Sequence, residues 1–145
     1  MDFRYTEISL NPCTAFPAGV ELKRPLLDVL LRNGKRAVSL TAMVDSGSDF
    51  CIFPASFAKA LGIALPTGKS ITFTGSADRP QVAHFETIQV AIWNENREED
   101  PISFDVYAGF CDSVEHVGLG ILGQHGFFSQ FKVTCDHTNE VLTIT

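Results

Sequence analysis

Val44-Asp45-Ser46-Gly47-Ser48 is the stretch that decides how this chain is interpreted. An apolar segment from Thr41 to Val44 ends in the carboxylate of Asp45, and a tight Ser-Gly turn follows at once. A carboxylate at the end of a buried strand is costly unless its neighbours satisfy it, so such a placement usually has a chemical reason. The Asp-Ser-Gly triplet occurs once in the 145 residues. Taken alone, it is more often a strand-end turn capped by the aspartate side chain.

Short apolar segments separated by turn signals surround the triplet, and this pattern predicts an all-β barrel or sandwich. Asn33-Gly34 is a strong hairpin signal between strands expected at 25–31 and 37–44, because both turn positions accept positive φ. Further strands are expected at 50–53, 70–74, 82–93, 102–107, 131–133 and 141–144. Pro54–Gly62 is expected to form a short helix, and 125–131 a helical turn.

Length and composition bound the function classes. A chain of 145 residues with 45% apolar and 19% charged residues is typical of one folded domain. Its net charge of −6 and scattered basic residues argue against nucleic acid as a partner. No segment approaches the roughly 18 apolar residues of a membrane span, and the N-terminus lacks a signal-peptide pattern. We therefore expect a cytoplasmic protein with no membrane contact, whose cysteines are reduced thiols: Cys13, Cys51, Cys111 and Cys135.

Two weaker motifs do not support a function. Gly118 to Gly123 matches the spacing G-x-G-x-x-G, but a dinucleotide site needs a strand–turn–helix unit and a second parallel strand. Only 22 residues follow Gly123, too few to complete that sheet. The histidines and cysteines lack the close paired spacing of a structural zinc site. No metal or organic cofactor is expected.

A second element follows the triplet about half a chain later, where Ile121-Leu122-Gly123 precedes the expected helical turn. The ordered pair of Asp45-Ser46-Gly47 and Ile121-Leu122-Gly123 resembles the retropepsin family, the single-domain aspartic proteases of retroviral type. The resemblance runs from about residue 24 to residue 144. It implies a closed β-barrel-like acid-protease fold with one or two short helices, formed by a single domain over residues 1–145.

The resemblance also implies an activity. Aspartic proteolysis uses two carboxylates that share one proton, and this chain carries one triplet. The second carboxylate would come from another copy, so the enzyme is expected to be a homodimer with two-fold symmetry. The function implied is an aspartic endopeptidase that acts on peptide or protein substrates. A non-catalytic peptide-binding or dimerisation module on the same fold is the alternative.

Residue roles follow from the matched positions. Asp45 would be catalytic, supported by the Ser46 hydroxyl and the Gly47 turn, and Ile121, Leu122 and Gly123 would support the site. The substrate would contact Gly47, Ser48, Asp49 and a flap over 71–88, whose tip includes Gly75 and Ser76. A hydrogen bond from the Ser48 hydroxyl to Asp45 would extend activity to acidic pH.

Two departures from the retroviral pattern concern the dimer. Gln124 stands where the family carries an arginine that pairs with the acid matching Asp49, so a hydrogen bond would replace an ion pair. Retroviral dimers interleave their chain ends in one sheet, whereas this chain has a long N-terminal segment from Met1 to Lys23. The dimer contacts are therefore expected to differ.

Overall fold

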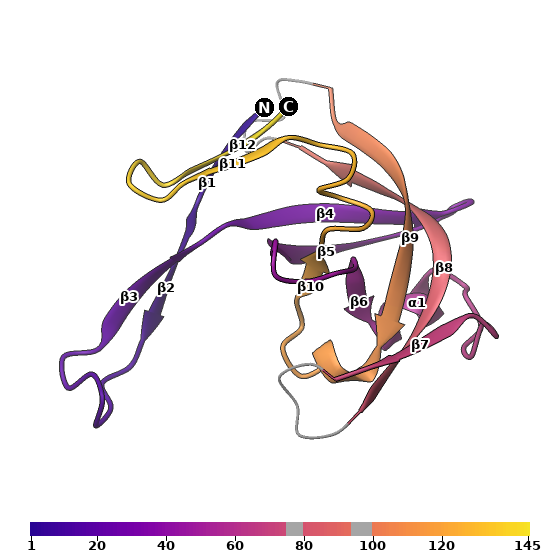
Figure 1. Cartoon of the computed structure of the whole chain (residues 1–145), viewed down its shortest axis with the longest axis horizontal. Helices are drawn as coiled ribbons and strands as arrows, with labels where there is room; N and C mark the ends of the chain where they lie inside the picture. The colour runs from indigo at the N-terminus through magenta and orange to yellow at the C-terminus, as the bar shows by residue number, and fades with distance from the viewer. Residues whose placement is uncertain (75–79, 94–99) are drawn as a thin grey trace.

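A closed β-barrel forms the body of the protein (Figure 1). The computed structural model describes residues 1–74, 80–93 and 100–145. Neighbouring strands around the barrel follow the order β4-β5-β10-β6-β9-β8, and β8 pairs back onto β4 to close it. The strands are β4 (Leu26–Asn33), β5 (Arg36–Val44), β6 (Ile52–Pro54), β8 (Gln81–Ile92), β9 (Ile102–Cys111) and β10 (Gly120–Leu122). The predicted all-β barrel is confirmed.

The β4–β5 hairpin leads into the triplet, which begins just beyond the end of β5. Alternating residues of β4 face the core, so Leu27, Val29 and Leu31 are buried while their neighbours are more exposed. Asn33 pairs with Arg36, so the turn consists of Gly34 and Lys35 and lies one residue later than predicted. Gly34 has a φ of 57°, which suits a hairpin turn with glycine at its first central position.

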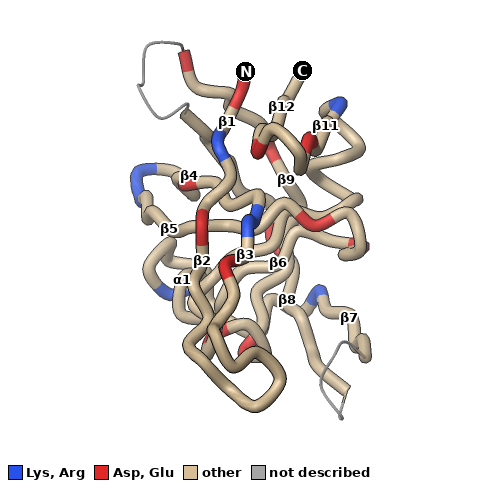
Figure 2. The backbone as a smooth tube through the Cα atoms, turned by 90° about the vertical axis from the view of Figure 1, so that its left-hand side faces the viewer, with Lys and Arg blue, Asp and Glu red and all other residues tan. Residues whose placement is uncertain are grey.

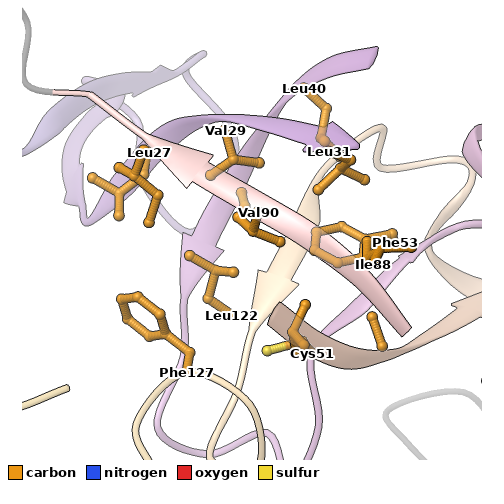
Figure 3. Close-up of a cluster of buried hydrophobic side chains, with 14 of the residues drawn as sticks. Leu27, Val29, Leu31, Leu40, Cys51, Phe53, Ile88, Val90, Leu122 and Phe127 are labelled. Atoms are coloured by element: carbon orange, nitrogen blue, oxygen red, sulfur yellow. The ribbon is translucent and has the colours of Figure 1, made fainter. Parts of the chain in front are cut away.

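The barrel interior is filled by aliphatic and aromatic side chains from facing strands. Figure 3 shows Val29 of β4, Val90 of β8 and Leu122 of β10 directed toward one another. Each of these three side chains is at most 2% exposed. Burial of such side chains drives folding by about 1.5–3 kcal/mol each, so this contact holds the strand pairings together.

Helical structure is short in the described part of the chain. Pro54 precedes α1 (Ala55–Ala60), and Gly62, with a φ of 73°, follows it, which confirms the predicted helix. A 3-10 turn, η1 (Asp112–Val114), follows β9. Within the segment 125–131, where a helical turn was predicted, residues 126–130 form hydrogen-bonded turns, and the Phe131 N–H donates to the Phe127 carbonyl at 3.1 Å. No helix among the described residues has the length and apolar character to cross a membrane.

The two ends of the chain form a small sheet of their own. Its order is β1-β12-β11, made by β1 (Asp2–Arg4), β11 (Val133–Asp136) and β12 (Val141–Ile144). The closing strand predicted at 131–133 therefore begins later, at Val133. The N- and C-termini lie close together in Figures 1 and 2.

Neither β1 nor a two-stranded hairpin formed by β2 (Thr6–Leu10) and β3 (Val20–Arg24) was predicted from the sequence. This hairpin stands away from the barrel in Figure 1. We call residues 6–24 the arm.

Leu31→Ala tests the core. Leu31 is 0% exposed, so the substitution leaves a cavity and should lower the free energy of unfolding by about 3 kcal/mol in a urea titration. Val117→Ala is the matched control, because Val117 is 53% exposed and its truncation should change stability by less than about 0.5 kcal/mol. Equal losses in both variants would contradict the described core.

Candidate active site

Asp45 lies just beyond the end of β5, half-buried, in a turn that backbone hydrogen bonds fix from two sides. Its N–H donates to the carbonyl of Leu122 at 3.1 Å, which ties the residue to β10. Its own carbonyl accepts from the N–H of Ser48 at 3.2 Å, which closes the turn. The chain turns here because Val44 is buried in the core, whereas the Ser46-Gly47 pair that follows favours an exposed turn.

β10 supports this turn from behind. It runs parallel to β5 and antiparallel to β6, and Ile121 is in register with both Met43 and Ile52. The segment Ile121-Leu122-Gly123 therefore lies directly beside the triplet. The structure brings the two sequence elements together although about 75 residues separate them.

Gly123 lets two backbone segments approach closely. A Cβ at this position would lie 2.2 Å from the carbonyl oxygen of Phe50 and 2.7 Å from that of Ser48. Beyond it, the Gln124 N–H donates to Ser48 O and the His125 N–H to Asp49 O, both at 2.8 Å. The loop from Ser46 to Phe50 is thus held along its length by residues 122–125.

The side chains of the loop differ from expectation in two places. The Ser48 hydroxyl donates to the Phe50 carbonyl at 2.9 Å, so the predicted bond to Asp45 is wrong, and the expectation of acid tolerance loses its basis. The N–H of Gly47 instead donates to Asp45 Oδ1 at 2.9 Å. Gln124 Nε2 donates to the Ser46 carbonyl at 2.8 Å and not to Asp49.

The loop forms part of the wall of a cleft with a volume of about 640 Å³. Asp45, Gly47, Ser48 and Asp49 line it, together with Ile121 from β10. Ser46 is exposed. Phe73, Thr74 and Gln81 line the cleft from the flap predicted over 71–88. Further lining residues were not predicted from the sequence: Arg24, Met43, Ser113, Val114, His116, Val117, Leu119 and Gly120. Their positions depend on tertiary pairing, and no local motif marks them.

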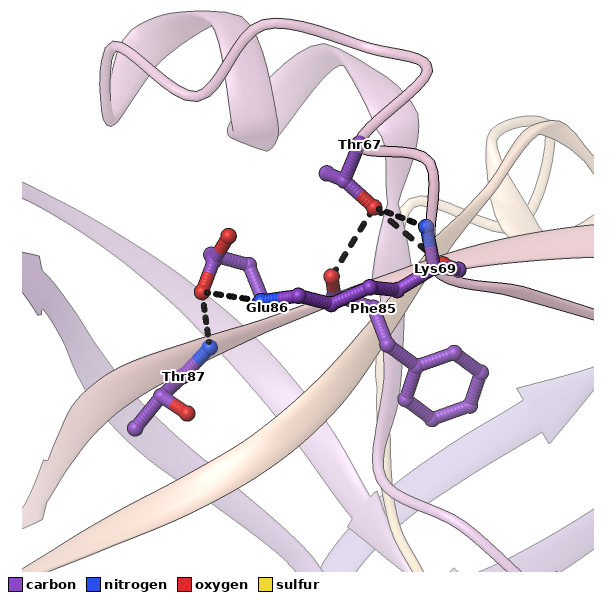
Figure 4. A network of polar contacts seen from close by, with 5 residues as sticks. All are labelled: Thr67, Lys69, Phe85, Glu86 and Thr87. Atoms are coloured by element: carbon purple, nitrogen blue, oxygen red, sulfur yellow. Dashed lines mark hydrogen bonds and ion pairs between the residues drawn. The ribbon is translucent and has the colours of Figure 1, made fainter.

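One edge of the cleft is formed by the hairpin of β7 (Ser70–Phe73) and β8, where the flap was predicted. Figure 4 shows how its base is held: the Thr67 hydroxyl donates to the Phe85 carbonyl at 3.0 Å, and Lys69 pairs with Glu86 at 3.7 Å. Gly75 and Ser76, predicted to contact substrate, lie outside the described residues.

Metal ligands are not gathered in the part of the chain that the structure describes. Among residues 1–74, 80–93 and 100–145, no three His, Cys, Asp or Glu side chains form a group that could hold a metal ion. The described residues that line the cleft carry the carboxylates of Asp45 and Asp49, serine hydroxyls, the Arg24 guanidinium and the His116 imidazole.

The fold has a solved counterpart. Neither a known family model nor a curated protein matches this chain. The chain is similar to the crystal structure of a retropepsin-like aspartic protease from Rickettsia conorii, with a TM-score of 0.51 and 17% identity. The match covers 97% of this chain and 98% of that chain. The chain therefore has the retropepsin-like aspartic protease fold, and the predicted resemblance is confirmed for the fold.

Gly123→Ala tests the close approach behind the triplet. Because the new Cβ would meet the Phe50 carbonyl at 2.2 Å, we expect a loss of about 3 kcal/mol in the free energy of unfolding. Gly34→Ala is the comparison, because nothing lies within 4 Å of its Cβ and the cost should be about 1 kcal/mol from its positive φ. Losses of equal size would show that sterics at Gly123 do not matter.

Thiol reactivity tests the packing beneath the loop. Burial raises the pKa of the Cys51 thiol to about 11, so little thiolate forms near neutral pH. In the native protein, Ellman's reagent should react quickly with exposed Cys13 and Cys135. It should react with Cys51 and Cys111 only after unfolding, because both are buried. Rapid reaction of all four cysteines in the folded protein would contradict this arrangement.

Proposed function

We propose that this protein is an aspartic endopeptidase, active as a homodimer, in which two Asp45 carboxylates, one from each subunit, activate a water molecule. The observation that carries the proposal is the position of Asp45 in the wall of the cleft, on a turn fixed by the Leu122 carbonyl. A rigid backbone at this point is what catalysis requires, since a carboxylate must be held in a fixed geometry to act on bound water. The retropepsin-like fold supports the same assignment.

The chemistry would follow from the pair of acids. Two carboxylates a few ångströms apart cannot both ionise, so they share one proton. The ionised Asp45 would accept a proton from water, whose oxygen attacks the scissile carbonyl carbon. The protonated Asp45 would donate to the carbonyl oxygen and give a tetrahedral diol. Protonation of the amide nitrogen then accompanies cleavage of the carbon–nitrogen bond and releases an amine and a carboxylic acid.

The residues around Asp45 would position the substrate and its partner loop. The Ser46 hydroxyl is exposed, as a group that bonds across a dimer must be before association. Gly47, Ser48 and Asp49 line the cleft and would bind the main chain of an extended peptide. Gln124 braces the loop from its own chain through the Ser46 carbonyl.

A non-catalytic peptide-binding module is the second candidate. The observation that favours it is the uncharged bracing at Gln124, which bonds a carbonyl where the retroviral pattern has an ion pair. The cleft would serve binding as well as cleavage. Peptide cleavage by the purified protein would support the protease, and peptide binding without cleavage would support the binding module.

Asp45→Asn is the direct test. Wild type should cleave members of a peptide library at some pH between about 3 and 7, and the variant should lose at least about 1,000-fold in kcat/KM, because an amide cannot act as the base. Asp105→Asn, at an exposed position on β9, is the control and should keep activity. No cleavage by wild type at concentrations where it is dimeric would exclude the protease, and cleavage by Asp45→Asn would exclude Asp45 as the catalyst.

Subunit mixing tests whether both carboxylates are needed. When wild type is refolded with an equal amount of Asp45→Asn, mixed dimers take up wild-type subunits. Activity should fall to about half of that of the same amount of wild type alone, because random association leaves half of the wild-type subunits in mixed pairs. Undiminished activity would mean that one Asp45 is enough and that the site does not span the dimer.

A further inference from the structure

The arm has one apolar face. In its register, Ile8 lies opposite Leu22 and Leu10 opposite Val20, so these four side chains share one side of the hairpin. The residues between them, Glu7, Ser9, Glu21 and Lys23, occupy the other side. An alternation of this kind is typical of a sheet with one covered face.

This face packs on neither hydrophobic core of the described residues, although Ile8, Val20 and Leu22 are half-buried. Ile8, Leu10, Val20 and Leu22 belong to neither hydrophobic core cluster and do not pack against either. Leu10 is 43% exposed, and Phe16 in the loop at the tip is 49% exposed. Two-stranded hairpins are only marginally stable in water without packing on one side. The apolar face therefore lacks a partner that its pattern calls for.

The base of the arm is held to the turn between β11 and β12 by polar contacts with Glu140. Lys23 pairs with Glu7 across the hairpin and lies 3.5 Å from Glu140 in the turn between β11 and β12. The Tyr5 N–H also donates to the Glu140 carbonyl at 2.9 Å. An anchored arm loses less conformational entropy on binding than a free one would.

The apolar face leads to the catalytic cleft. Arg24 lies on the same side of the hairpin as Leu22 and Val20, because side chains two apart share a face. Arg24 lines the cleft together with Asp45. The Pro25 carbonyl that follows accepts a hydrogen bond from the Val44 N–H at 3.0 Å.

We propose that the arm is a dimerisation element: its apolar face packs against a second copy of this chain, and each subunit of the dimer is held by the other's arm. The proposal rests on the proposed function, because the single Asp45 requires a second copy at this cleft. Two-fold symmetry makes the contact reciprocal, so each dimer would bury two apolar faces. Pairing of the chain ends within one subunit, in the β1-β12-β11 sheet, leaves the arm as the extended element available for this role.

Ile8→Glu is the test, with Ser9→Glu as its matched control. Both variants place a carboxylate on β2, one on the apolar face and one on the polar face. Sedimentation velocity over a concentration series should give a dimer dissociation constant at least about tenfold higher for Ile8→Glu, because a charge would enter a buried apolar contact. Ser9→Glu should match wild type. Thermal unfolding at low concentration checks that both variants fold.

Activity separates this proposal from the proposed function. Ile8→Glu keeps Asp45, so its cleavage rate per subunit should recover as protein concentration rises. Unchanged dimerisation of Ile8→Glu, with active protein, would overturn the arm's role and leave the protease intact. Wild type that stays monomeric at every concentration would overturn both.

Hydrogen exchange of wild type gives a second measurement that does not depend on a variant. The amides of β2 and β3 should exchange more slowly as the concentration rises through the dimerisation range. Protection that appears only when a peptide is added to the monomer would assign the apolar face to substrate and overturn the proposal.

Discussion

The insertion of β10 between β5 and β6 is the constraint on which the rest of the site depends. β10 pairs with both neighbouring strands, parallel to β5 and antiparallel to β6. Its last residue is followed by Gly123, which passes so close to the Phe50 and Ser48 carbonyls that no side chain fits. The direction of the Asp45 turn and this part of the cleft wall follow from this contact, while the pairing of β8 with β4 closes the barrel.

The sequence predicted the elements that carry strong local signals. The Asp45 triplet, the hairpin before it and α1 were marked by turn chemistry and by proline and glycine at helix ends. Ile121-Leu122-Gly123 was predicted to support the triplet because of the family resemblance, and it lies there. The shift of the hairpin turn by one residue arose because Asn33 and Gly34 both tolerate positive φ, which leaves the register open.

The remaining features depend on contacts that a single strand pattern does not specify. Ser48 and Gln124 each had a carboxylate as the expected partner, but both donate to backbone carbonyls of the folded loop. The strands of the arm were missed because Asn11 to Gly19 carries several turn residues and because short alternating segments are weak signals. The cleft residues around η1 were missed because only the fold brings them near Asp45.

The sheet formed by the two chain ends has a consequence for the order of events in assembly. Because β1 pairs with β12 inside one chain, the terminal sheet of the proposed homodimer would form without the second copy. Folding would then be a first-order process, and association of two folded subunits a separate, second-order one. Dilution of such a protein would yield folded single subunits instead of unfolded chains, so its working state would be set by local abundance rather than by the stability of the barrel.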